Sequence, residues 1–494
     1  MKKNPIIKAL SLAIAVLFSL NSTVFAQDAN LTKLVEQMQQ QMSQMQQTIN
    51  SQNAKIASIE GQTGGKNIGK PVDPQVEEQK IKTMFEKQLG KDYSTFKDLK
   101  FTGDLRLRYE AFDYSSGTRS SATANTQETD PRNRFRYRLR MGLEKKFSDE
   151  ISAGFSLASG DNAGGSVSGS TASVGNVDPT STNTTFDNNF NFKNIFIERA
   201  WATYKPAWAA VGPVSGVEIT GGKFKNPFER GSSDIIWDRD VRPEGIYEAM
   251  DFRLFDSESV KATGWFTAGQ FILDEDATVG NNTTGGDANL YAFQIGMNPK
   301  LKLDSMEKPL GLTSALSLYN FSNYANQSNF IINGTSLARG NGNNDGNSTQ
   351  LDAKGFNIIE VYNELKIPVG NLPVRPFYDY VHNMDDQNTI INGHNNAFGV
   401  GITFGEAKTK GQWEAGYTYK YIGADATVGA FADSDFGDGH TNKRGSVLKA
   451  KYMLTDYLEF GLAGFLVDNI YQDTGNGVPD LNQKRFQADL VWKW

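Results

Sequence analysis

From residue 101 to the C-terminus, apolar and polar side chains alternate with a period of two in successive short segments. Such alternation is typical of strands with one apolar face and one polar face. Each segment is about as long as a tilted strand must be to cross a bilayer. The pattern predicts sixteen strands, at residues 101–113, 133–147, 150–160, 192–205, 215–225, 244–255, 259–274, 288–302, 309–323, 355–367, 372–383, 394–406, 410–423, 442–454, 456–468 and 481–494.

The connections between these segments alternate strictly between long and short. The long ones include residues 114–132, 161–191, 226–243, 324–354, 424–441 and 469–480, and the short ones include 148–149, 256–258, 368–371 and 455–456. Outer-membrane barrels have short periplasmic turns, long external loops and an even number of strands, whereas soluble sandwiches and propellers have no reason to keep long loops at one end. The sequence therefore predicts an all-β fold, with a transmembrane antiparallel β-barrel of about 16 strands over residues 101–494 enclosing a water-filled pore.

The final segment closes with alternate apolar residues, Phe486, Ala488, Leu490, Trp492 and Trp494. A closing strand of this kind resembles the recognition signal of the outer-membrane assembly machinery, although the terminal residue is usually Phe. The other faces of such strands are polar, as expected where one face meets lipid and the other meets water. The sequence thus predicts outer-membrane lipids and the assembly machinery as partners.

The N-terminus has the features of a secretory signal. Three lysines precede an apolar run at residues 9–20, and Val24-Phe25-Ala26 supplies the small residues of a cleavage site. A single transmembrane anchor is the alternative, but the run is too short to cross about 30 Å of hydrocarbon. We expect residues 1–26 to be a signal peptide, so that the mature chain begins at Gln27.

Residues 27–61 carry a heptad repeat. Its seam consists of Leu31, Val35, Met38, Met42, Met45, Ile49, Gln52, Ile56 and Ile59. A period of 3.5 residues over about four heptads indicates a coiled coil, whereas a lone helix adsorbed on a membrane would have a polar face rich in Lys and Arg. We expect a periplasmic α-helical coiled coil, followed at residues 62–100 by a linker with a short helix.

Composition excludes several classes of protein. The chain of 494 residues has no cysteine, which excludes a disulfide-built scaffold, and its net charge of −6 argues against nucleic-acid binding. The histidines, His382, His394 and His440, fall at or beyond the predicted outer rim without a serine partner, so we expect no enzyme, catalytic residue, cofactor or metal. Asp433, Asp435 and Asp438 admit two readings, calcium ligands or solvated acidic turns.

The first two predicted strands carry arginines on one face. These residues are Arg106, Arg108, Arg134, Arg136, Arg138 and Arg140. A lipid-facing arginine costs several kcal/mol at the midplane, so this basic wall must face the lumen. It would attract anionic solutes, or it would be paired with carboxylates and merely brace the wall; the sequence leaves both readings open.

The third long connection, Asn226 to Pro243, combines aromatic residues with charges of both signs. The charged residues include Arg230, Asp234, Asp238, Arg239, Asp240 and Arg242. This composition resembles the inward-folded constriction loop of sixteen-stranded porins, which narrows the lumen. The alternative is an external loop held by its own ion pairs.

The strand at 192–205 breaks the alternation. Arg199 lies in phase with Ile195, Ile197 and Trp201, so either a β-bulge or a position at the rim must keep its charge out of lipid. Trp201, like Tyr204, lies near a strand end and suits an interfacial aromatic girdle.

Four features together carry a resemblance to a family. They are the opening from Phe101 to Tyr109, the stretches Lys223–Phe228 and Trp237–Asp240, and the aromatic C-terminus. With the signal and coiled coil, the chain resembles the "putative porin" proteins of Gram-negative bacteria. The resemblance implies an outer-membrane porin for passive diffusion of small hydrophilic solutes or ions, assembled as a homo-oligomer with a trimer favoured.

Two other functions compete with the porin. A TonB-coupled transporter would need about 22 strands and a folded plug. An envelope tether, in which the coiled coil links the outer membrane to the cell wall and the barrel is an anchor, stays open as the alternative function. Anion preference depends on whether the arginine wall attracts solutes.

Overall fold

The computed structural model describes residues 98–114, 131–160, 179–190, 192–230, 233–275, 287–304, 306–324, 331–332, 335–336, 355–385, 394–470 and 482–494. They belong to a unit that spans Asp98–Trp494. The predicted signal peptide and coiled coil, and almost all of the predicted linker, lie outside the described residues. Within these described segments, no helix is long and apolar enough to cross a membrane.

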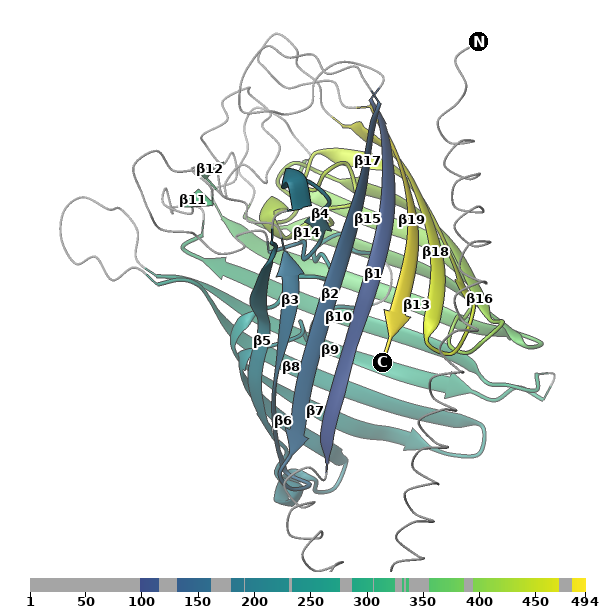
Figure 1. Cartoon of the computed structure of the whole chain (residues 1–494). Helices are drawn as coiled ribbons and strands as arrows, with labels where there is room; N and C mark the ends of the chain where they lie inside the picture. The colour runs from purple at the N-terminus through teal and green to yellow at the C-terminus, as the bar shows by residue number, and fades with distance from the viewer. Residues whose placement is uncertain are drawn as a thin grey trace, which may run out of the picture. The chain divides into compact units, whose positions relative to one another are not determined.

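Antiparallel strands close into one barrel (Figure 1). Its sheet has 17 strands, and all but the two-residue β4 are wall strands, which leaves sixteen. β1 closes the barrel because it pairs with β2 on one side and with β19 on the other. The wall strands are β1 (Leu99–Tyr114), β2 (Arg132–Lys146), β3 (Ile151–Gly160), β5 (Asn194–Tyr204), β6 (Val214–Lys223), β7 (Glu244–Asp256), β8 (Val260–Asp274), β9 (Ala288–Leu301), β10 (Leu310–Ser322), β13 (Phe356–Val369), β14 (Leu372–Asn383), β15 (Asn396–Gly405), β16 (Trp413–Ile422), β17 (Lys443–Met453), β18 (Leu458–Asn469) and β19 (Asn482–Lys493).

The remaining elements are short and lie in connections. β4 (Thr184–Thr185) pairs with β2 beyond the end of the β2–β3 ladder, so part of the second long loop extends the wall. The others are β11 (Ile331–Ile332), β12 (Thr335–Ser336) and the 3-10 turns η2 (Asn188–Phe190), η3 (Ala207–Ala209) and η5 (Gly429–Phe431).

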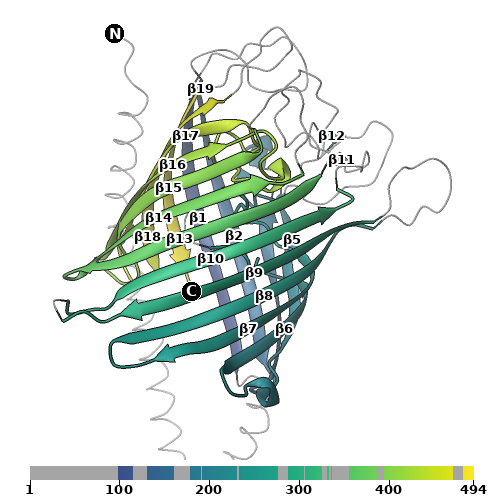
Figure 2. The same ribbon diagram turned by 180° about the vertical axis from the view of Figure 1, so that it is seen from behind.

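The predicted barrel and its strand number are confirmed. The largest boundary difference is at the strand that begins at Trp413 rather than at residue 410. Long and short connections alternate around the barrel as predicted, and neighbours along the sequence pair with one another (Figure 2). Local alternation was sufficient here because each antiparallel hairpin is built from consecutive segments.

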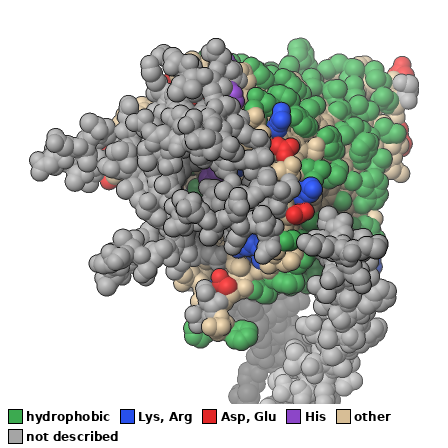
Figure 3. Space-filling view, turned by 90° about the horizontal axis from the view of Figure 1, so that it is seen from above, with side chains coloured by type: hydrophobic (Ala, Val, Ile, Leu, Met, Phe, Trp, Pro, Cys, Tyr) green, Lys and Arg blue, Asp and Glu red, His purple; other side chains and the backbone are tan. Residues whose placement is uncertain are grey.

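The register separates an apolar outer face from an inner face. Tyr417 pairs with Ile402 and Leu448, all on the outer face, while the next register row pairs Gly416 with Thr403 and Lys449 on the inner face. Hydrophobic side chains cover the outer wall in Figure 3. Because lipid offers no hydrogen-bond partners, this alternation keeps charges inside the barrel.

A β-bulge resolves the irregular strand β5. Ser156 of β3 pairs with Arg199, but its neighbour Leu157 pairs with Ile197, so Glu198 is the extra residue. The bulge turns Arg199 inward, where its Nε donates to the Ser156 Oγ at 2.9 Å. Trp201 also faces inward, beneath the Arg199 guanidinium at 4.7 Å, so its assignment to the interfacial girdle was wrong.

Candidate functional site

The third long loop, L3 (residues 224–243), folds into the barrel. Phe228 and Trp237 are buried among aromatic residues of the inner wall, and both rings contact Tyr319 of β10, with centroids 5.8 and 5.6 Å away. Phe228 also meets Phe271 of β8 edge-on at 5.9 Å. Where these two rings pack, the inner wall of β8 and β10 is therefore aromatic, while Gln294 of β9 and Asp379 of β14 bond to L3 beside it.

Charged residues attach L3 to both sides of the barrel. Asp240 accepts from the Arg140 Nη2 of β2 at 2.7 Å, and Arg242 donates to Glu198 of β5 at 2.9 Å. At the far wall, the Lys449 Nζ of β17 lies 3.5 Å from Asp234. L3 therefore crosses the lumen, as a constriction loop would, and is not held only by its own ion pairs.

The cations around L3 lower the pKa values of two of its aspartates, Asp240 and Asp234. Burial alone would raise the pKa of Asp240, but the guanidinium groups of Arg140, Arg138 and Arg106 hold that pKa well below its ordinary value. Burial would likewise raise the pKa of Asp234, yet the charges of Arg239, Lys449 and Lys420 lower that pKa. Both carboxylates therefore stay ionised against the cations that anchor them.

Asp238 has the opposite environment. Burial raises the pKa of this carboxyl well above its ordinary value, and the nearby carboxylates of Asp240 and Asp433 raise it further. Its role is to join L3 to the seventh long loop, L7 (residues 423–442): the Ser434 N–H donates to Asp238 at 2.8 Å, and the Asp238 N–H donates to the Phe431 carbonyl at 2.7 Å.

L7 also folds inward, which the sequence did not indicate. Asp433 pairs with the buried Lys420 of β16 at 2.8 Å, and Asp435 pairs with Arg108 at 2.9 Å and Arg485 at 2.7 Å. Asp433 and Asp435 are therefore ion-pair partners of the inner wall rather than solvated acidic turns. Within the described part of the chain, no group of three or more His, Cys, Asp or Glu side chains is arranged to hold a metal.

The six arginines of the basic wall all face the interior, and five of them meet carboxylates. Arg108 binds Asp489 of β19 at 2.8 Å, and Arg138 binds Asp104 at 2.7 Å. Arg140 contacts Glu198 at 3.1 Å, besides its bond to L3. The partners come from β1, β5, β19, L3 and L7, so the wall is the centre of an ion-pair network rather than a bare basic surface.

Glu110 lies at the middle of this network and is completely buried. It accepts from Arg485 at 2.6 Å and from Gln487 at 3.0 Å, and it forms an ion pair with Arg134. Arg136 lies farther from this carboxylate, at 3.8 Å. One carboxylate therefore ties the closing strand β19 to β1 and β2.

Arg106 differs from its neighbours. Among the described residues its polar partner is an uncharged one, the Asn183 Oδ1 of the second long loop at 2.5 Å. Asn183 also receives a contact from Arg136 at its carbonyl, at 3.3 Å. The second loop therefore packs against the basic wall without neutralising it.

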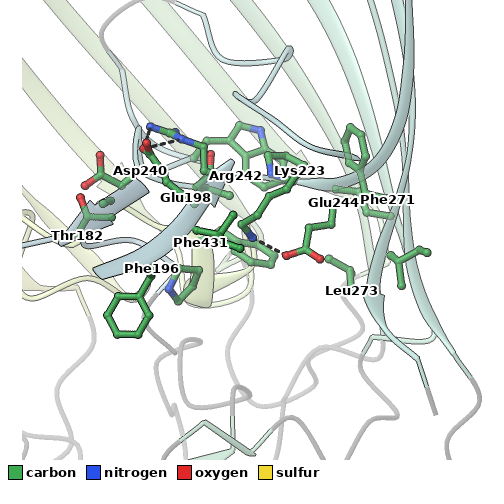
Figure 4. A pocket seen from close by; sticks show the side chains of 18 of the residues that line it. Thr182, Phe196, Glu198, Lys223, Asp240, Arg242, Glu244, Phe271, Leu273 and Phe431 are labelled. Atoms are coloured by element: carbon green, nitrogen blue, oxygen red, sulfur yellow. Dashed lines mark hydrogen bonds and ion pairs between the residues drawn. The ribbon is translucent and has the colours of Figure 1, made fainter. Parts of the chain in front are cut away.

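A cavity of about 340 Å³ lies beside the base of L3 (Figure 4). It lies where β6 ends at Lys223 and β7 begins at Glu244, two residues that form an ion pair of 2.5 Å, and β8 continues past them to Asp274. Phe196 and Phe431 lie toward its other side in the view. Its lining combines the ion pairs Lys223–Glu244 and Arg242–Glu198 with apolar side chains.

The structure brings one residue of the predicted constriction loop into contact with the basic wall and places the others elsewhere in the lumen. Asp240 of L3 contacts the basic wall directly, whereas Asp234 reaches Lys449 of β17, Arg239 pairs with Asp234 inside the loop, and Arg230 stacks on Trp265 at 5.0 Å. The sequence reasoning missed Asp435, Arg485, Asp489 and Glu198 as partners of the wall. The inward phase of Glu198 on β5 and of Arg485 and Asp489 on β19 was a usable signal, whereas Asp435 lies in L7 and has no strand phase. All four pairings required the closed barrel.

Comparison with known proteins names the family. The family model described as "Putative porin" matches residues 94–381 and 377–492. The chain belongs to this porin family. It is thus an outer-membrane channel protein with a closed antiparallel barrel. No curated protein matches the chain.

Solved structures similar to this porin include three from other bacteria. A high-pH structure of Pseudomonas putida OprB is 10% identical, with 83% of this chain and 97% of that chain covered and a TM-score of 0.45. Vibrio cholerae OmpT in its trimer form is 10% identical, with 80% of this chain and 99% of that chain covered and a TM-score of 0.39. The outer-membrane channel DcaP of Acinetobacter baumannii is 11% identical, covers 80% and 97%, and has a TM-score of 0.39.

Proposed function

We propose that this porin allows small hydrophilic solutes to diffuse passively through its lumen, with L3 as the constriction. The observation that carries this proposal is that L3 crosses the lumen from its base between β6 and β7 to β17 on the other side, where Asp234 meets Lys449, while Asp240 holds the loop to Arg140 of β2. A loop held at both ends narrows the lumen without moving, so it selects solutes by size and charge. The loop residues of this constriction are Arg230, Asp234, Asp238, Arg239, Asp240 and Arg242.

We further propose that the arginine wall mainly braces the barrel. Arg108, Arg134 and Arg138 each meet a carboxylate within ion-pair distance, so most of their charge is compensated. A buried, compensated guanidinium attracts a passing anion less than an exposed one does.

Single-channel recording in planar bilayers tests the function. Purified full-length protein should give discrete conductance steps, and removal of the two attachments by Asp240→Asn with Asp234→Asn should increase the step size or its fluctuation. Absence of conductance steps at every voltage would refute the channel. Unchanged steps in the double variant would refute the constriction role of L3.

We also propose a homo-oligomer, with a trimer as the expected form, whose interface includes the outer face of β7 and β8. Glu248 is the fifth residue of β7 and faces outward, paired with Ile219 and Ala268. Gln270 lies on the same face, opposite Ile246. A carboxylate on the outer face is costly in hydrocarbon, so a neighbouring subunit is the better environment for it.

The absence of cysteine from the native sequence gives a direct test of this interface. A single cysteine at Gln270 should form cross-linked oligomers in membranes, while a cysteine at Leu448 on the lipid face of β17 should not. Equal cross-linking at both positions, or none at Gln270, would refute the proposed interface.

A further inference from the structure

The inner wall of β13–β17 carries cations that the arginine wall does not include. The first group lies at the short-turn end of the barrel, where Glu406 follows β15. Its carboxylate meets the Lys408 Nζ at 2.7 Å and the Lys366 Nζ at 3.9 Å. Lys300 and Lys308 line the same recess, which has a volume of about 770 Å³. One carboxylate is therefore surrounded by several lysines.

The second group lies closer to the middle of the barrel. Glu414 of β16 pairs with Arg375 of β14 at 2.7 Å and with Lys451 of β17 at 3.9 Å. Glu414 and Lys451 are also register partners, so they lie side by side on the inner face. Two cations again share one carboxylate.

The third group lies at the constriction. Asp234 of L3 pairs with Arg239 at 2.9 Å and with Lys449 at 3.5 Å. Glu229 lies 3.8 Å from the same Arg239, so this group has two acidic members. Lys449 and Lys451 occupy alternate positions of β17, which joins the second group to the third.

A small cavity of about 60 Å³ connects these two inner groups. Its lining includes Arg239, Glu414, Lys449 and Lys451, together with the small residue Gly416. Gly416 lies in one register row with Lys449, so a residue without a side chain leaves space beside the lysine. The cations here border open volume, whereas the apolar side of L3 fills the opposite wall.

The lysines are the exposed members of these groups, whereas Arg375 is 20% exposed against 25% for its partner Glu414. At the short-turn end the Lys408 side chain is 69% exposed and Glu406 is 30% exposed. At the constriction Lys449 is 43% exposed, against 6% for Asp234. The paired Arg108 of the basic wall is only 6% exposed. A solute in the lumen therefore meets ammonium groups first, with the carboxylates behind them.

We propose that these three cation groups form a stepwise path for small anions along β13–β17, and that this path, not the arginine wall, sets the ion preference of the pore. The inference rests on the proposed channel function. The ligand class is small solutes that carry a carboxylate or a phosphate. Several weak sites in series suit conduction, because each shared carboxylate keeps its cations from binding an anion too tightly.

The test is the zero-current potential of the full-length porin in a potassium chloride gradient. A unit charge about 4 Å from an ion changes its energy by about 1 kcal/mol in water, which is about fivefold in a partition ratio. Lys449→Gln alone should therefore lower the ratio of chloride to potassium permeability by at least about fivefold, and Lys449→Gln with Lys451→Gln should lower it further. Lys451→Arg, which keeps the charge, should leave the ratio near that of the native protein.

Two comparisons make the outcome decisive. Lys484→Gln removes a lysine from the outer face of β19 and should not change the ratio. Arg136→Gln, in the basic wall, should change it less than the lysine pair does. Normal conductance steps with an unchanged ratio in the lysine variant would overturn the path while leaving the channel intact. Absence of steps in the native protein would instead overturn the channel function.

Discussion

Replacement of Glu110 by Gln is the sharpest test of the ion-pair network. The carboxylate is completely buried and lies within 4 Å of several guanidinium groups, among them Arg134 and, at 2.6 Å, Arg485. Gln keeps the volume and one carbonyl acceptor but removes the charge. Breaking a buried pair by removing one partner costs about 3–5 kcal/mol, because the remaining charges stay buried without compensation.

To measure this cost, the protein is refolded into lipid vesicles and then unfolded with urea, and the unfolding is followed by tryptophan fluorescence. We expect Glu110→Gln to lower the free energy of unfolding by about 3–5 kcal/mol. The matched control is Glu244→Gln, which breaks the pair with Lys223, where the Glu244 side chain is 62% exposed. An exposed pair contributes about 0–1 kcal/mol, so this variant should unfold almost as the native protein does.

A double-mutant cycle separates the pair from other effects. Arg485→Gln combined with Glu110→Gln should be less destabilising than the sum of the two single variants, with a coupling free energy of about 0.5–3 kcal/mol. If Glu110→Gln costs no more than the Glu244→Gln control, the network does not stabilise the closure of the barrel, and the bracing role of the arginines is wrong.

Two further results are expected. Trp237→Ala should cost about 3–5 kcal/mol of stability and increase the noise of single-channel currents, because its ring packs L3 against Tyr319; Trp208→Ala, at an exposed turn, is the control, and native-like noise in Trp237→Ala would contradict the packing. The Lys408 hydrogen bond, assisted by the charge of Lys366, lowers the pKa of Glu406, so its charge persists as pH falls through the ordinary Glu value of about 4.3 and is lost only as pH falls through the lowered pKa. Glu406→Gln should therefore raise the chloride preference at pH 7, and the difference from the native protein should persist as the pH falls through the ordinary Glu pKa and be lost only below it. A difference that is already lost above the ordinary Glu pKa would contradict the lowered pKa.

Period-two alternation and loop length determined the barrel, its strand number and the phase of the inner residues on the regular strands. They placed Arg108, Lys449 and Lys451 inside because a charged side chain in lipid is too costly, a constraint that acts on every residue separately. The alternation even marked its own exception at Arg199, although only the pairing of β3 with β5 showed that Glu198 forms a bulge.

Tertiary structure decided which charges meet. Arg108 and Asp489 are 381 residues apart and become partners only because β1 pairs with β19. Likewise, Asp240 reaches Arg140 because L3 folds inward, and Asp435 reaches Arg108 because L7 does. Side-chain type fixes the sign of each charge, but its compensation depends on loops whose path is set by packing across the whole barrel. The basic wall was therefore visible in the sequence, and its neutralisation was not.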